Sequence, residues 1–304
     1  MNYAPYADYP LSTTDTGIAF RYAPARNLDS VPIVLLHGLS QQGDYWWPVI
    51  ESLGSERAIV SIDLNGHGES RRMKSDYQVS SVSKDCVSVL DLLEIDQACV
   101  VGHSWGASVA LHFAANFADR THSAVLVDGG AFTPANILNR GSISRERLRV
   151  ELTPPKGPFA ESELRAHYLP PGIDLSVAEQ DSVMQAIGRT YQTAPSAGLV
   201  TTIGFERHMA VLDSFFDYNP DSDLELITVP SWILIACDLN RPTGTDTLDD
   251  WARAKHDVDG KVQGKMNIAL QHWYGAVHDV PLYWPDRVAD LIAHAAQRRR
   301  GRLT

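Results

Sequence analysis

The stretch Cys99-Val100-Val101-Gly102-His103-Ser104-Trp105-Gly106-Ala107 decides the fold of this chain. An apolar run, typical of a buried strand, ends at Gly102, and a helix-like segment follows from Ala107 to Phe117. Between them stands Gly-x-Ser-x-Gly, the pattern of a serine on a sharp strand-to-helix turn. Its glycines lack a Cβ atom, so neighbouring backbone can pass closely. We therefore predict that Ser104 is a nucleophile at a helix N-terminus, where free N–H groups favour a negative charge.

Outward from this stretch, apolar runs that suit strands alternate with segments at helical spacing. We expect strands at Gly17 to Tyr22, Val31 to Leu36, Ala58 to Ile62, Ala98 to Val101, Ser123 to Val127, Val229 to Ala236, and within Lys265 to Gln271. Helices are expected at Tyr45 to Leu53, Val82 to Ile95, and Pro285 to Gln297. Such alternation predicts an α/β fold with a mostly parallel central sheet flanked by helices.

The alternation stops after Gly130 and resumes at Val229. The segment between them is too long for one loop. It contains two helix candidates, Leu175 to Tyr191 and Leu199 to Phe216. We predict an inserted helical cap, residues 131–223, and a core domain made of residues 1–130 and 224–304.

The chain has 304 residues, 44% of them hydrophobic, and a net charge of -11. This charge disfavours nucleic acid and anionic membranes as partners, and a small-molecule substrate is expected instead. No signal peptide and no membrane span are apparent in the sequence. The three cysteines, Cys86, Cys99 and Cys237, lack metal-ligand spacing, so we expect buried thiols in a reducing cytoplasm. A homodimer remains open.

Four motifs in order give the chain a family resemblance. They are His37-Gly38 after an early strand, Gly66-His67-Gly68-Glu69-Ser70 after the next, Gly102-His103-Ser104-Trp105-Gly106, and Val277-His278-Asp279-Val280-Pro281. Together they resemble the α/β-hydrolase fold superfamily in its capped form, and they span nearly the whole chain. The resemblance implies an oxyanion hole made by the backbone N–H groups of Leu39 and Trp105.

A serine hydroxyl is almost wholly protonated at neutral pH, so Ser104 needs a base to take its proton. His278 fits, because it comes late in the chain and follows the last expected strand, which is the order this fold uses. His272 is the alternative, although it lies near or in that strand. No histidine pair has the spacing of a metal site, so neither a catalytic metal nor another cofactor is expected.

The acid partner of His278 has two candidates. Most members of the family place it after the strand that follows the cap, where Asp238 stands about one residue early and without the usual glycine. A minority place it at the end of the strand before the cap, where Asp128 is in register. We favour Asp128 slightly and keep Asp238 open, with Asp246 and Asp279 as weaker candidates.

These residues predict a serine hydrolase that cleaves a carboxylic ester or lactone through an acyl-enzyme on Ser104. The alternatives are a thioesterase, a C–C bond hydrolase or an acyltransferase of the same fold, and a slow-turnover ligand-binding receptor. A cap over an apolar pocket suits a medium-sized, largely apolar substrate. Aromatic side chains are expected to line that pocket: Trp46, Phe205, Phe215 and Phe216.

Overall fold

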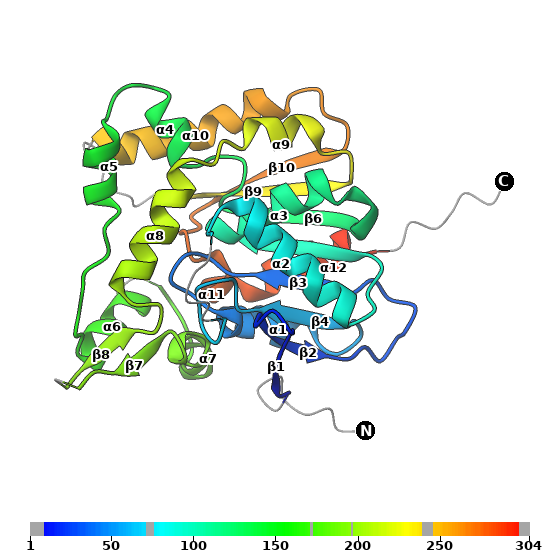
Figure 1. The fold of residues 1–304 in the computed structure, drawn as a ribbon, viewed down its shortest axis with the longest axis horizontal. Helices are drawn as coiled ribbons and strands as arrows, with labels where there is room; N and C mark the ends of the chain where they lie inside the picture. The colour runs from blue at the N-terminus through cyan, green and yellow to red at the C-terminus, as the bar shows by residue number, and fades with distance from the viewer. Residues whose placement is uncertain (1–8, 71–75, 171–172, 196, 239–245, 298–304) are drawn as a thin grey trace.

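An eight-stranded sheet forms the centre of the computed structural model, which describes residues 9–70, 76–170, 173–195, 197–238 and 246–297 (Figure 1). The strand order is β1-β2-β4-β3-β5-β6-β9-β10. The strands are β1 Leu11–Thr13, β2 Ala19–Ala23, β3 Ile33–Leu36, β4 Ile59–Ile62, β5 Ala98–His103, β6 Thr121–Val127, β9 Ser231–Cys237 and β10 Ile268–Tyr274. The two pairings that involve β2 are antiparallel, and the others are parallel. The predicted fold class is confirmed.

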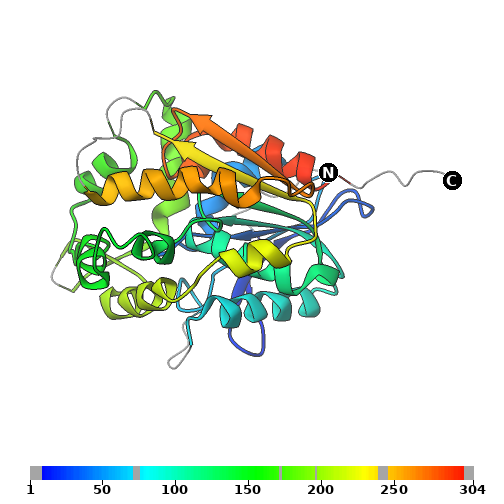
Figure 2. The same ribbon diagram turned by 90° about the horizontal axis from the view of Figure 1, so that it is seen from above.

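Helices cover both faces of this sheet (Figures 1 and 2). One layer contains α2 Val79–Leu92, α3 Trp105–Asn116, α9 Asp221–Leu226 and α10 Asp246–Val262; the other contains α1 Trp47–Leu53 and α12 Pro285–Ala295. There are also three short helical turns: η2 Gly43–Trp46 before α1, η3 Ala118–Arg120 between α3 and β6, and α11 Val280–Tyr283 before α12. On β3, Val34 and Leu36 pack into the first layer, whereas Ile33 and Leu35 pack into the second. Burial on both faces explains why this strand is an unbroken apolar run.

The segment between β6 and β9 stays out of the main sheet. It contains α4 Pro134–Leu138, α5 Arg145–Glu151, α6 Glu161–Tyr168, α7 Val177–Gly188, β7 Tyr191–Thr193, β8 Leu199–Thr201 and α8 Phe205–Phe216. Strands β7 and β8 pair only with each other as named strands. Helix α9, which packs on α3, crosses the expected boundary at residue 223. The division into core and cap domains stays a prediction.

Two helix expectations in this segment are wrong at one end. Tyr191 belongs to strand β7, and Leu199 belongs to strand β8. The reason is a hairpin, because β7 and β8 pair antiparallel, with Tyr191 opposite Thr201 and Thr193 opposite Leu199. The backbone of Leu199 also exchanges hydrogen bonds of 2.7 and 2.8 Å with Phe159. Gly198, at φ +84°, makes the turn that precedes β8. Helix α8 therefore begins only after Gly204.

The glycines around Ser104 hold two backbones in contact. A Cβ atom on Gly102 would lie 2.1 Å from the carbonyl oxygen of Gly106. A Cβ atom on Gly106 would lie 2.3 Å from the carbonyl oxygen of His37 and 2.5 Å from that of Leu36. Helix α3 thus starts directly against the end of β3, which no residue with a side chain would permit.

The cysteines are unbridged, as expected, but only two of the three are buried. Cys86 and Cys99 are inaccessible, whereas Cys237, at the end of β9, is partly exposed. Among the helices of the described residues, none has both the length and the apolar character needed to cross a membrane. The cytoplasmic location stays a prediction.

Gly106→Ala is expected to lower the free energy of unfolding by about 1–3 kcal/mol or more, because the new methyl group overlaps two carbonyl groups. Urea denaturation measures the change. Gly260→Ala is the matched control: this glycine lies within α10 with nothing near its Cβ position, so alanine should stabilise by roughly 0.5–1 kcal/mol. Equal stability of the two variants would contradict the close contact.

Candidate active site

Ser104 sits in a strained turn between β5 and α3. Its backbone has φ 54° and ψ -119°, a left-handed conformation that residues with a Cβ atom rarely adopt. Its N–H donates to the carbonyl of Val127 at 3.0 Å. Gly129 presses on it from the other side, since a Cβ atom there would lie 2.3 Å from the carbonyl oxygen of Ser104. The surrounding backbone therefore fixes the direction of the hydroxyl.

His278, in the turn between β10 and α11, lies beside this hydroxyl. Its Nε2 is 3.0 Å from Oγ of Ser104, and its Nδ1 is 2.7 Å from Oδ2 of Asp128. An ionised carboxylate only accepts hydrogen bonds, so Nδ1 carries the hydrogen and Nε2 can accept the serine proton. The predicted nucleophile, base and favoured acid are thus brought together.

The charges around Asp128 keep it ionised. Burial alone would raise its pKa, but Lys255 and His278 outweigh burial and lower the pKa to about 2. For His278, burial would lower the pKa, and the hydrogen bond and charge of Asp128 outweigh it, so the pKa is raised. The ring of His278 is 54% exposed, so water screens part of this effect.

The other candidates for base and acid have different surroundings. Asp238 follows β9 and is exposed, and both ring nitrogens of His278 are already engaged by other residues. His272, on β10, lies 3.2 Å from Asp259. Asp279 accepts a hydrogen bond from the hydroxyl of Tyr45 at 2.9 Å. The side chain of Asp246 lies outside the described residues.

The loop after β3 brings the first predicted oxyanion donor to the site. A Cβ atom on Gly38 would lie 3.2 Å from Cβ of Ser104, so the loop packs against the nucleophile. In the described part of the chain, no backbone acceptor is assigned to the N–H of Leu39 or of Trp105. The role of these two N–H groups as an oxyanion hole stays a prediction.

Two buried histidines hold this loop. His37 accepts the N–H of Leu64 at 2.9 Å through Nε2, so its Nδ1 carries the hydrogen and donates to the carbonyl of Gly38 at 2.8 Å. Burial lowers the pKa of His37 to about 3, so the ring stays neutral. His67 accepts the N–H of Ser40 at 3.2 Å. The histidines of the two turn motifs thus form hydrogen bonds with backbone groups of the loop that follows β3.

Helix α8 contacts the same loop through His208. Nδ1 of His208 lies 2.5 Å from the hydroxyl of Ser40, the residue after the predicted donor Leu39. Ser40 has a left-handed backbone, φ 70°. The N–H of Ser40 bonds to His67 and its hydroxyl contacts His208, so this strained position depends on two segments far apart in the sequence.

The loop that carries His278 is held by the residue before the nucleophile. His103 donates from Nε2 to the carbonyl of His278 at 2.9 Å and stacks on the ring of Tyr45 at 5.1 Å between centroids. Burial lowers the pKa of His103 to about 4, so the ring stays neutral. Sequence analysis gave His103 no role, and its place between the two glycines is the only signal that could have suggested one.

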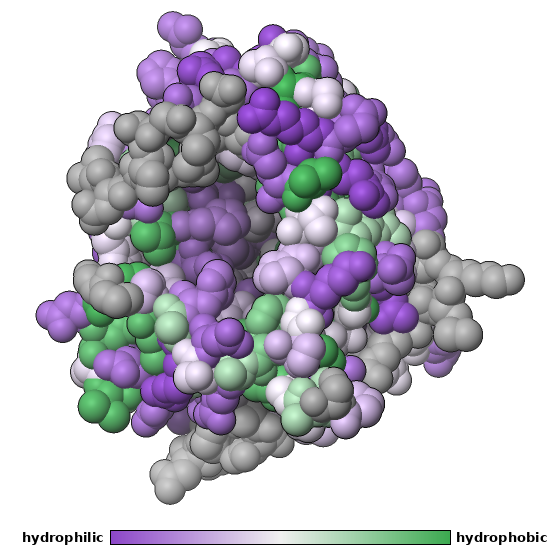
Figure 3. Space-filling model, turned by 90° about the vertical axis from the view of Figure 1, so that its left-hand side faces the viewer, coloured by the Kyte–Doolittle hydropathy of each residue, from purple (hydrophilic) through white to green (hydrophobic). Residues whose placement is uncertain are grey.

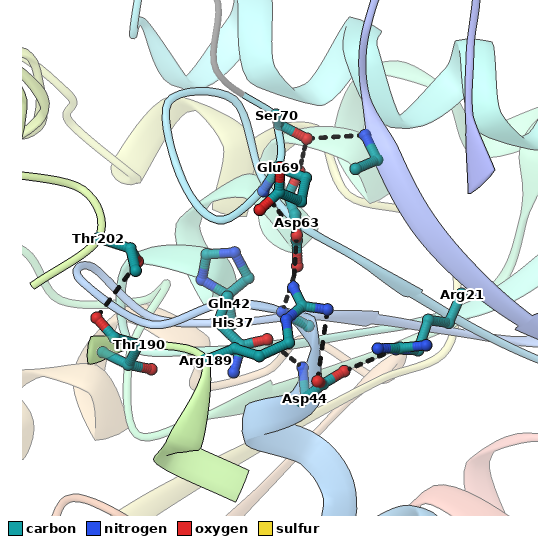
Figure 4. Close-up of polar contacts among 12 residues, drawn as sticks. Arg21, His37, Gln42, Asp44, Asp63, Glu69, Ser70, Arg189, Thr190 and Thr202 are labelled. Carbon is teal, nitrogen blue, oxygen red and sulfur yellow. Dashed lines mark hydrogen bonds and ion pairs between the residues drawn. The ribbon is translucent and has the colours of Figure 1, made fainter. Parts of the chain in front are cut away.

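A network of charged side chains ties α7 to the core beside these loops (Figure 4). Arg189, at the end of α7, donates to Asp63 at 2.7 Å and lies 3.3 Å from Asp44. Asp44 also pairs with Arg21 of β2 at 3.0 Å, and Asp63 accepts the N–H of Gly43 at 2.7 Å. Two carboxylates thus face two guanidinium groups, so neither carboxylate is buried without an opposite charge.

The four aromatic residues predicted to bind substrate fall into two groups. Trp46 has no exposed surface and packs in the core, and Phe216 is 3% exposed, so the prediction is wrong for these two as placed here. Phe205 and Phe215 are partly exposed and remain predicted pocket residues. The face that carries α5, α6 and α8 is hollowed, and the visible floor of the hollow is largely hydrophilic (Figure 3). The apolar pocket for a medium-sized, largely apolar substrate stays a prediction.

No group of three His, Cys, Asp or Glu side chains among the described residues is arranged to hold a metal ion. The polar groups nearest Ser104 are instead joined in one chain of hydrogen bonds through His278 to Asp128. A hydroxyl, an imidazole and a carboxylate joined in this order are able to carry out acyl transfer.

Comparison with known proteins bears on the family and the fold. A family model described as the alpha/beta hydrolase fold matches residues 31–194. An uncharacterized protein of Mycobacterium tuberculosis is 32% identical over 130 residues, which cover 40% of this chain and 38% of that protein. The chain therefore spans less than half the length of this relative.

Two solved structures share the fold over almost the whole chain. One is an E-2-(acetamidomethylene)succinate hydrolase, with a TM-score of 0.68, 18% identity, and coverage of 94% of this chain and 98% of its own. The other is the enol-lactonase of Burkholderia xenovorans LB400, with a TM-score of 0.63, 18% identity, and coverage of 94% and 99%. At this identity the likeness concerns the fold alone.

The histidines of the site should titrate differently. We expect His37 and His103 to remain neutral from about pH 5 to 8, because burial holds their pKa values near 3 and 4, whereas the pKa of His278 should lie above its ordinary value. Ring proton shifts followed by NMR against pH measure each value. Titration of His103 near neutrality would contradict the buried, neutral ring described above.

Proposed function

Because the chain belongs to the α/β-hydrolase fold family, we propose that it is a serine hydrolase that cleaves a carboxylic ester or lactone of a medium-sized small molecule. The observation that carries this proposal is the hydrogen-bonded chain from Ser104 through His278 to Asp128. A hydroxyl placed 3.0 Å from an unprotonated ring nitrogen can lose its proton as it attacks a carbonyl carbon.

Acylation follows from these positions. His278 takes the proton of Ser104 while Oγ bonds to the carbonyl carbon of the substrate, and Asp128 stabilises the imidazolium that forms. The N–H groups of Leu39 and Trp105 stabilise the negative charge on the carbonyl oxygen. His278 then gives its proton to the leaving alcohol, and the acyl group remains on Ser104.

Deacylation reverses the roles. A water molecule takes the place of the alcohol, His278 removes its proton, and the acid product leaves as Ser104 regains its hydrogen. A lactone differs only in that the leaving alcohol stays attached to the acyl group. The side chain of His278 is 54% exposed, which supports the entry of a water molecule at this step.

Esters and lactones are proposed as substrates because of their oxygen leaving group. The enol-lactonase shares the fold, and an oxygen leaving group needs the proton that His278 can supply. A thioesterase, a C–C bond hydrolase or an acyltransferase would use the same residues, and a slow-turnover receptor would keep them. Turnover of ester, lactone and thioester panels separates these alternatives.

Ser104→Ala is expected to keep the fold and to lower hydrolysis of a chromogenic ester by several orders of magnitude, because only the oxyanion hole and binding remain. A fluorophosphonate probe should label the wild type on Ser104 and leave the variant unlabelled. Circular dichroism controls for folding. Turnover by the variant at the wild-type rate would end the serine-hydrolase proposal.

Asp128→Asn and Asp238→Asn form a matched pair, since each removes one charge with little change of volume. Asp128→Asn should lose most of kcat, roughly 10⁴-fold, because the amide favours the wrong tautomer of His278. It should also lower the pKa of His278, since the carboxylate stabilises the charged ring. Asp238→Asn should retain most of the rate. A larger loss in Asp238→Asn would make Asp238 the acid.

A further inference from the structure

A lysine on helix α10 contacts Asp128, the acid of the proposed triad. Lys255, on α10, places Nζ 2.8 Å from Oδ1 and 2.9 Å from Oδ2 of Asp128. The same ammonium lies 2.9 Å from the carbonyl oxygen of Ala236 on β9. Sequence analysis did not single out this residue, because nothing in a charged amphipathic helix marks one lysine as different.

The ammonium of Lys255 has no free donor for a substrate. An ammonium carries three N–H groups, and here three oxygen atoms lie within hydrogen-bond distance of it. Its side chain is 17% exposed, and that of Asp128 is fully buried. Lys255 therefore acts on Asp128 rather than on a bound molecule.

Asp128 is in turn fully engaged. Oδ1 accepts the N–H of Ala236 at 2.9 Å as well as the contact from Lys255, and Oδ2 accepts from Lys255 and from His278. Both backbone groups of Ala236 are thus used, one for the carboxylate and one for the lysine. These contacts leave the carboxylate one orientation, with Oδ2 toward Nδ1 of His278.

We propose that Lys255 is a positioning residue of the triad, which orients Asp128 and, by its charge, sets the pH below which His278 stops acting as a base. This inference rests on the proposed function of Ser104 and His278. It is a role through Asp128, since Lys255 touches neither the nucleophile nor the base in the contacts described.

The sign of the charge effect follows from the groups that face His278. Asp128 and Asp279 favour the protonated ring, Lys255 disfavours it, and His103 is neutral. Without Lys255, the negative charge of Asp128 would act on His278 uncompensated and would raise the pKa of the ring further. Lys255 thus keeps His278 unprotonated to a lower pH than the Asp–His pair alone would allow.

Lys255→Met tests this inference through the rate at which a fluorophosphonate labels Ser104, measured against pH. We expect the midpoint of the acid limb to move to higher pH, so that on this limb labelling is several-fold slower relative to the alkaline plateau. An NMR titration of His278 should show the same shift without any need for activity. Lys255→Arg should restore the wild-type midpoint, since it returns the charge.

Two further variants control the experiment. Lys261→Met removes a lysine from the same helix that pairs with Asp221 at 2.6 Å, and its midpoint should equal that of the wild type. Lys255→Gln removes the charge but keeps a donor, and it replaces Lys255→Met if the latter does not fold.

The outcomes separate the two proposals. An unchanged or lowered midpoint for His278 in Lys255→Met and Lys255→Gln, with Ser104 still labelled, would overturn the role of Lys255 and leave the serine hydrolase intact. Failure of the wild type to be labelled on Ser104 would overturn the proposed function, and the NMR titration would still report on Lys255.

Discussion

The backbone contact between the start of α3 and the end of β3 is the constraint on which the site depends. Gly106 lies against the carbonyl groups of Leu36 and His37 with no room for a side chain. Because the two backbones touch, the loop that follows β3 is brought to Ser104, and Gly38 packs on the nucleophile. The same packing holds Ser104 in its left-handed conformation. One backbone contact therefore sets the positions of both Ser104 and the loop that follows β3.

The second constraint is the buried charge of Asp128. A carboxylate without exposure is costly unless several donors and an opposite charge surround it. Here the N–H of Ala236, the ammonium of Lys255 and the ring of His278 supply them. The strand β9, which precedes the alternative acid Asp238, contributes its backbone instead. This support explains how a carboxylate directly after β6 can face a histidine that follows β10.

Much of this was predictable from the sequence. Unbroken apolar runs predicted the strands that cross the core. Burial on both faces of the sheet leaves such a run, as at Ile33 to Leu36. The Gly-x-Ser-x-Gly motif singled out Ser104 as the candidate nucleophile. The position of His278 after the last strand singled it out as the candidate base. Register alone favoured Asp128, which is the aspartate that the structure places beside His278.

What the sequence did not predict depends on distant contacts. Strand β8 pairs with β7 and, at Leu199, also with Phe159, a contact from earlier in the chain that the local residues do not encode. An aromatic residue such as Trp46 suits either a substrate pocket or the core. Only its burial in the structure distinguishes the two positions. Lys255 is one of several charged residues on α10, and only the fold brings it to Asp128. Local sequence patterns therefore predict the fold class, whereas the charges that surround a buried group depend on contacts between residues far apart in the sequence.

The most direct test of the central claim is to trap the acyl-enzyme. The protein is mixed with an activated acetyl ester, quenched in acid within the first turnover, digested, and mapped by peptide mass spectrometry. The account predicts an acetyl group on the hydroxyl of Ser104, formed in a burst equal to the concentration of enzyme. Steady turnover with the acyl group on another residue, or on none, would contradict it.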